Sequence, residues 1–115
     1  MADTILVLIK SNPLESHRPV EAVRIALGLI SGEHSVAVVL LNQAPLLLSD
    51  DTEDLIDGDI LQKYLPTLKE LGQTFLVEET AFKTHLPKGS DYAIQAVSFD
   101  KIADRVQQAN RFFIF

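Results

Sequence analysis

The fold class of this chain is indicated by residues 5–41, ILVLIKSNPLESHRPVEAVRIALGLISGEHSVAVVLL. Five apolar residues (5–9) lead into a polar loop (10–16), followed by helical spacing from about residue 19 to 31 and by a second apolar run at 36–41. Apolar runs without alternation are typical of parallel strands, which are covered on both faces. A strand, a helix and a second strand in this order predict a βαβ unit.

The rest of the chain continues this alternation of apolar runs and helical periods. The further predicted elements are a helix over residues 60–71, a strand over 74–77, a helical turn over 78–83, a strand or buried helix over 93–97, a helix capped by Ser98 and a final strand over 111–115. Pro66 removes a backbone hydrogen bond from the first of these helices, which predicts a kink or two short helices. About five mostly parallel strands with helices on both faces predict a flavodoxin-like three-layer α/β sandwich, one domain over residues 1–115.

Composition and charge narrow the possible functions. The chain has 115 residues, enough for one domain, with 10 basic and 16 acidic side chains and a formal net charge of −6. Because Lys and Arg do not cluster, nucleic acid and anionic membranes are poor candidate partners. The absence of cysteine excludes disulfides, thiolate metal ligands and a sulfur nucleophile. No stretch resembles a signal peptide or the roughly 20 apolar residues of a membrane span, so we expect a cytoplasmic protein.

The first predicted helix is apolar around most of its circumference. One face carries Val20, Val23, Leu27 and Ile30, and the residues Ala22, Ile25, Ala26 and Leu29 cover much of the remainder. A surface helix normally shows a broader polar face, so this helix needs a second apolar neighbour. Three consecutive leucines at residues 46–48 indicate the same. We expect that neighbour to be another subunit; the alternative is that other helices of the same domain cover both features.

In open α/β sheets, ligands bind beyond the carboxyl ends of the strands, so the loops that follow the predicted strands contain the candidate site residues. These candidates are polar side chains: Asn12, His17, Gln43, Glu78, Glu79 and His85. Adjacent carboxylates raise one another's proton affinity, which makes Glu78 a candidate general base, but such a pair is equally typical of a helix N-terminus. Ser16 is a candidate N-cap beside an exposed His17. The histidines lack the spacing of metal ligands, so we predict no metal and no cofactor.

Residues 5–48, ILVLIKSNPLESHRPVEAVRIALGLISGEHSVAVVLLNQAPLLL, resemble the opening of the DsrE/DsrF-like family, which includes the TusD and TusC subunits of tRNA thiolation. The shared pattern is a strand, a small polar loop, an apolar helix and a second strand, and it continues in LKELG (68–72). The resemblance implies a cytoplasmic, Rossmann-like protein that works in a sulfur relay. It also implies a homo-oligomer, either trimer or hexamer, or a mixed oligomer with DsrE/F/H-like subunits.

Active members of this family carry a persulfide on a Cys just after the third strand, in a context like VCxxALKxxG. The matching stretch here is VEETAFKTH (77–85), which places Glu78 at the position of that Cys. A carboxylate cannot hold a persulfide, and the chain has no Cys elsewhere. Asn42 and Gln43 likewise stand where the family often has Gly-Asp. We therefore expect a non-catalytic subunit; the alternative is a small-molecule or anion-binding protein, or a modest enzyme, whose site surrounds Glu78.

Overall fold

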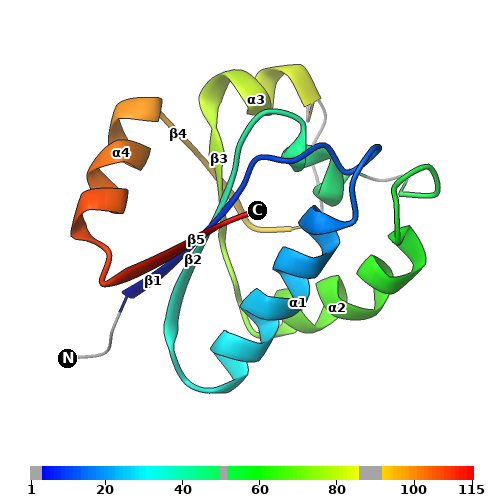
Figure 1. Cartoon of the computed structure of the whole chain (residues 1–115), viewed down its shortest axis with the longest axis horizontal. Coiled ribbons are helices and arrows are strands. Elements are labelled where there is room, and N and C mark those ends of the chain that lie inside the picture. The colour runs from blue at the N-terminus through cyan, green and yellow to red at the C-terminus, as the bar shows by residue number, and fades with distance from the viewer. Residues whose placement is uncertain (1–3, 50–51, 86–91) are drawn as a thin grey trace.

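The computed structural model describes residues 4–49, 52–85 and 92–115, which form five strands, four α-helices and one 3₁₀ helix (Figure 1). In chain order these are β1 (Thr4–Ile9), α1 (Arg18–Ser31), β2 (Ser35–Leu40), the 3₁₀ helix η1 (Ala44–Leu48), α2 (Gly58–Glu70), β3 (Phe75–Glu78), α3 (Glu79–His85), β4 (Ile94–Val97), α4 (Phe99–Gln108) and β5 (Arg111–Ile114). In this part of the chain, no helix is both long enough and apolar enough to cross a bilayer.

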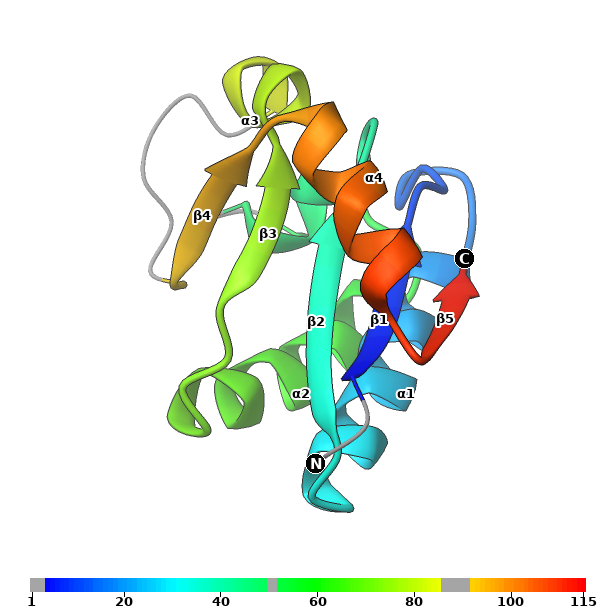
Figure 2. The ribbon, with the colours of Figure 1, turned by 90° about the vertical axis from the view of Figure 1, so that its left-hand side faces the viewer.

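The five strands form one sheet in the order β4-β3-β2-β1-β5, and every pair of neighbours is parallel (Figure 2). Helices α1 and α2 cover one face and α4 covers the other (Figure 1), so the predicted three-layer α/β sandwich is confirmed. This strand order differs from that of flavodoxin, which is 2-1-3-4-5. Here the chain lays β2, β3 and β4 on one side of β1 and returns to place β5 on the other.

The two faces of the sheet bury two separate hydrophobic clusters, because successive strand residues point to opposite faces. The larger cluster joins the sheet to α1 and α2 and includes Val7, Ile9, Val38, Leu40, Val20, Val23, Leu61, Leu65 and Leu68. The smaller cluster lies under α4 and consists of Leu6, Leu8, Val39, Leu76, Val97 and Ile102. The face under α4 therefore buries the smaller cluster, while two helices share the face with the larger one.

The second apolar neighbour of α1 is α2, which packs alongside it within the same chain (Figure 1). Leu27, Leu29 and Ile30 of α1 are half-buried against the larger cluster. Leu47 and Leu48 of η1 are fully buried in that cluster. Part of the apolar surface that predicted a subunit contact is thus covered from inside the domain, as in the alternative explanation, and part of it stays exposed. Whether the protein is an oligomer stays a prediction.

Two further expectations are decided by the structure. Pro66 lies inside α2, which runs without interruption from Gly58 to Glu70, so the division into two helices is wrong. Gln62 and Pro66 both lie on the exposed side of α2, where water can satisfy the carbonyl group that loses its partner. Residues 94–97 form a strand, and the exposure of Gln95 and Ala96 is incompatible with a buried helix.

Gly58 is required by a close approach of two backbone segments. A Cβ atom at this position would lie 2.2 Å from the carbonyl oxygen of Thr52. We expect Gly58→Ala to lower the free energy of unfolding by about 1–3 kcal/mol, because the loop before α2 must shift. Urea denaturation monitored by circular dichroism measures the change.

Gly28 provides the matched control. It lies exposed inside α1, and a Cβ atom there would meet nothing within 4 Å. Gly28→Ala should raise the free energy of unfolding by about 0.5–1 kcal/mol through helix propensity. Equal effects of the two substitutions would show that the contact with Thr52 has no energetic weight.

Candidate functional site

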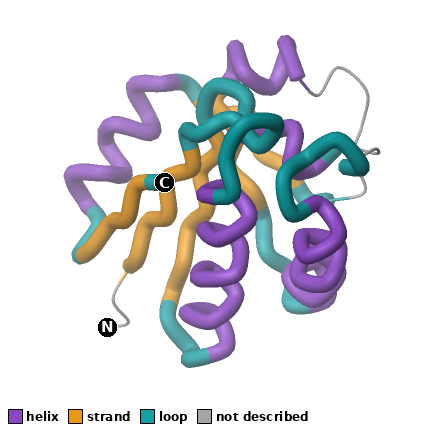
Figure 3. Tube along the Cα trace, turned by 45° about the vertical axis from the view of Figure 1, so that its right-hand side comes forward, coloured by secondary structure: helices purple, strands orange, loops and turns teal. Residues whose placement is uncertain are grey.

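The loops after β1, β2 and β3 meet at the carboxyl end of the sheet, where the sequence predicted a site (Figure 3). Leu41 N donates to Ile9 O at 2.9 Å, and Asn42 Nδ2 lies 3.5 Å from Lys10 O, so the first two loops are joined. Asn42 has a φ of 56°, a left-handed conformation that turns the chain into η1. Helix α3 packs against η1 and closes the other side of this edge.

The loop between β1 and α1 uses its polar side chains to hold its own shape. Asn12 Oδ1 accepts a hydrogen bond from Leu14 N at 3.0 Å, a local Asx turn. Ser16 Oγ accepts one from Arg18 N at 3.1 Å. The N-cap position of α1 belongs to His17, whose side chain makes no capping bond, so Ser16 is one residue before the position predicted for it. The amide of Asn12 is therefore engaged in the turn.

Glu78 ends β3 at the predicted edge of the sheet, and its side chain caps α3. Its Oε2 accepts a hydrogen bond from Ala81 N at 2.9 Å. That bond, supported by bonds from the backbone and hydroxyl of Thr80, lowers the pKa of Glu78, although partial burial acts in the opposite direction. The carboxylate is ionised at neutral pH and already bound. A general base works best with a pKa near the working pH, so this geometry counts against Glu78 in that role.

The other candidate residues are spread along the edge. Gln43 is exposed at the start of η1, Glu79 is exposed in the first turn of α3, and His85 is half-buried at the end of that helix. Within the described ranges, no hydrogen bond joins any two of the six candidates. No group of three His, Asp or Glu residues in those ranges is placed to hold a metal ion.

His17 has no described contact with Glu78, and the residue after it reaches toward the opposite side of the sheet. The neighbouring Arg18 extends its Nη2 to within 3.3 Å of the carbonyl oxygen of Ile114 in β5. In the sheet order, β5 is three positions from β3, which is about 14 Å at the usual spacing between strands. A site that used both the Arg18 guanidinium and Glu78 would therefore have to span most of the sheet.

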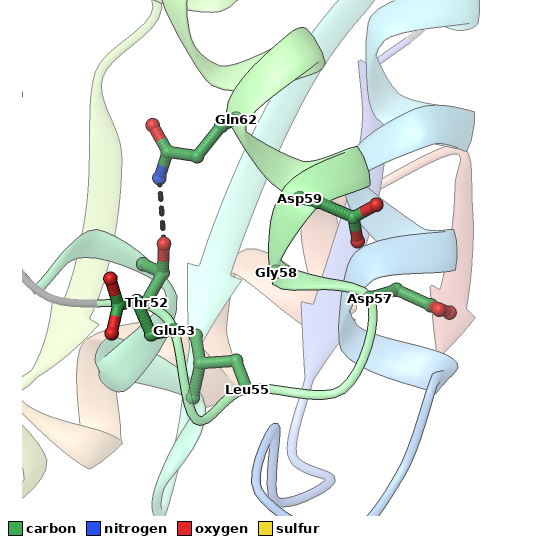
Figure 4. A pocket seen from close by; sticks show the side chains of 7 residues that line it. All are labelled: Thr52, Glu53, Leu55, Asp57, Gly58, Asp59 and Gln62. Carbon is green, nitrogen blue, oxygen red and sulfur yellow. Dashed lines mark hydrogen bonds between the residues drawn. The ribbon is translucent and has the colours of Figure 1, made fainter.

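A pocket of about 350 Å³ opens at the N-terminus of α2 (Figure 4). It is lined by Thr52, Glu53, Leu55, Asp57, Gly58, Asp59 and Gln62. Gln62 Nε2 donates to Thr52 Oγ1 at 2.9 Å across its wall, and Asp57 adopts a left-handed φ of 60°. None of the six predicted residues lines this pocket. The only sign of this pocket in the sequence is an acidic stretch, which is also typical of a linker. The carboxylates of the pocket disfavour an anionic ligand.

Comparison with known proteins supports the fold. No family model matches the chain, and no curated protein matches it. The crystal structure of the ychN protein from Escherichia coli is similar over the full length of both chains, with a TM-score of 0.81 and 15% sequence identity. At this identity the likeness establishes the fold alone. It supports the DsrE-like fold that the resemblance of the sequence implied.

The capping role of Glu78 predicts a pH-dependent contribution to stability. We expect Glu78→Ala to lower the free energy of unfolding by about 1 kcal/mol at pH 7, as for the loss of other helix caps. The pKa of Glu78 is lower in the folded than in the unfolded chain, so its contribution is complete above the ordinary pKa of about 4.3 and is lost as the pH falls through the lowered value. Urea titrations from pH 7 to pH 3 should show the two proteins converging.

Glu79→Ala is the control for this experiment. Glu79 stands next to Glu78 in the sequence, in the first turn of α3, but is exposed and forms no side-chain bond to the helix backbone. Its removal should cost only the smaller interaction with the helix dipole, about 0.3 kcal/mol. If both variants lost the same free energy at every pH, the cap at Glu78 would be refuted.

Proposed function

We propose that this chain is a non-catalytic, DsrE-like subunit of a cytoplasmic sulfur relay, which acts inside an oligomer and does not itself carry sulfur. The observation that carries this proposal is the position of Glu78. It occupies the junction of β3 and α3, which matches the position of the sulfur-carrying Cys in the resemblance, on a fold shared with the ychN protein.

The chemistry of this position explains how the fold is kept without the activity. A helix N-terminus favours a negative group, and in thiol proteins it stabilises the thiolate. Here the Ala81 N–H binds a carboxylate of the chain itself. The carboxylate satisfies the same helix end but has no sulfur atom to form or transfer a persulfide, and the sequence has no Cys. The chain would thus contribute structure to an assembly in which other subunits contribute thiols.

The partners proposed are copies of this chain, as a trimer or hexamer, or DsrE/F/H-like subunits that carry the Cys. Native mass spectrometry of this chain mixed with the thiol-bearing DsrE-like proteins of its own organism tests the mixed form. We expect a complex of fixed stoichiometry in which the added sulfane sulfur resides only on the other subunit. A chain that stays monomeric alone and in every such mixture would contradict the proposal.

A cysteine placed at residue 78 tests the match to the family position. In Glu78→Cys, the α3 N-terminus should lower the thiol pKa at least about one unit below the ordinary 8.5. The thiolate should then attack a sulfane sulfur of a polysulfide donor, which forms the Cys persulfide and releases the polysulfide shortened by one sulfur atom. The rate of alkylation by iodoacetamide as a function of pH measures this pKa.

Lys83→Cys is the matched control, because Lys83 is exposed in the last turn of the same helix, where the dipole does not favour a thiolate. Its thiol should titrate at an ordinary pKa. Equal alkylation profiles for the two variants would mean that residue 78 does not provide the environment of a sulfur-carrying Cys.

A further inference from the structure

The strand β5 forms one edge of the sheet (Figure 2). It is exposed along its length and apolar from Phe112 to Ile114. It pairs with β1, and no other described strand covers its outer side. Phe112, Phe113 and Ile114 retain 50%, 42% and 49% of their surface exposed. Exposed, apolar edge strands are templates for pairing with another chain. The exposed edge of β5 therefore raises the question of which molecule covers it.

The backbone of β5 offers free hydrogen-bonding groups at alternate residues. Phe115 N donates to Leu8 O at 2.8 Å, and Phe115 O accepts from Lys10 N at 2.8 Å, so Phe115 turns both groups toward β1. In a parallel ladder the direction alternates from residue to residue, so Phe113 also faces β1, whereas Phe112 and Ile114 face outward. Of their outward groups, only Ile114 O has a described partner, Arg18 Nη2.

The side chains of β5 provide apolar surface on both faces of the sheet. In the register with β1, Phe112 and Ile114 stand beside Leu6 and Leu8, on the face that α4 covers. Phe113 stands beside Val7 on the opposite face. There it borders a groove of about 330 Å³, lined also by Ile5, Leu29, His34 and Arg111. A strand added to this edge would thus bury apolar side chains above and below the sheet.

Charge decides which occupant fits. Arg18 and Arg111 are exposed near the two ends of β5, and the single ion pair within the described ranges is Arg24–Glu21, so both cations are unpaired there. Antiparallel pairing of two copies about Phe113 would oppose residue 111 to residue 115 and bring Arg111 close to the partner's Arg18. Like charges across paired strands are unfavourable. Carboxylates at both ends of an incoming segment would instead meet cations.

We propose that the outer edge of β5 is a docking site for an extended acidic segment of another protein, with apolar residues between its carboxylates. The segment adds a sixth strand by hydrogen bonding to Phe112 and Ile114, and its carboxylates pair with Arg18 and Arg111. This mode of recognition takes affinity from the backbone and specificity from alternate side chains and charge. The inference goes beyond the proposed function and stands without it, because it uses no feature of residue 78.

Nuclear magnetic resonance titration of the ¹⁵N-labelled protein with two blocked peptides tests the site. The probes are Glu-Val-Ile-Val-Glu and its matched control Lys-Val-Ile-Val-Lys, which have the same apolar centre and opposite charge. We expect the acidic probe to shift the amides of Phe112 and Ile114 more than that of Phe113, and to bind several-fold more tightly than the lysine probe at low salt. Added salt should reduce the difference.

Two variants separate the contributions of backbone and charge. Ile114→Pro removes an outward N–H that does not bond to β1, so it should abolish peptide binding. The amide signals of β1 should keep the positions that they have in the folded protein. Arg111→Gln should keep the fold and reduce the preference for the acidic probe.

Three results would overturn the proposal. The first is equal binding of both probes, and the second is the absence of shifts at Phe112 and Ile114. The third is a dimer of the unliganded protein, seen by sedimentation velocity, that Ile114→Pro dissociates, because a second copy would then cover the edge.

Discussion

The pairing of β1 with strands on both sides holds the domain together. Its residues from Ile5 to Ile9 are at most 5% exposed, and they contribute to both hydrophobic clusters. Leu6 and Leu8 face α4, while Val7 and Ile9 face α1 and α2. Because β1 is covered on both faces and both edges, it fixes where the other strands end. The loops that form the candidate site are positioned by those ends.

At the carboxyl end of the sheet, four polar side chains bind backbone groups of the loops and helix ends. Asn12 closes a turn, Ser16 binds the first amide of α1, Asn42 reaches Lys10, and Glu78 binds the first turn of α3. A working site normally keeps polar groups free to meet a ligand. The carboxylate of Glu78 is thus already bound within the protein, which accords with the non-catalytic role proposed above.

Much of the fold could be read from local patterns. The unbroken apolar runs predicted β1 and β2, and the spacing of Val20, Val23, Leu27 and Ile30 predicted α1, because burial on a sheet imposes those periods. The strand order could not be derived this way, since it depends on contacts between distant segments. For the same reason the sequence did not reveal that α2 covers the apolar back of α1, or that β5 stays exposed.

The site shows the same division between local and distant information. The sequence predicted Glu78 at the end of a strand, with a helix N-terminus as one of two interpretations of its role. Both predictions depend only on the residues next to Glu78. The contact of Arg18 with β5, far from Glu78, followed only from the place of β5 beside β1. The pocket at α2 depends on the close backbone contact at Gly58, for which a lone glycine in an acidic stretch is no signal.

The pairing of β1 with β5 has a consequence for folding during synthesis of the chain. Thr4 N donates a hydrogen bond to Asn110 Oδ1, 106 residues away, and the whole β1–β5 ladder spans a similar separation. While the ribosome is still adding the later residues, one flank of β1 has no strand to pair with. Pairings of such high contact order form slowly and leave nascent chains open to association with one another. A chain in which β1 has been made but β5 has not is therefore more open to misassembly than the complete sheet.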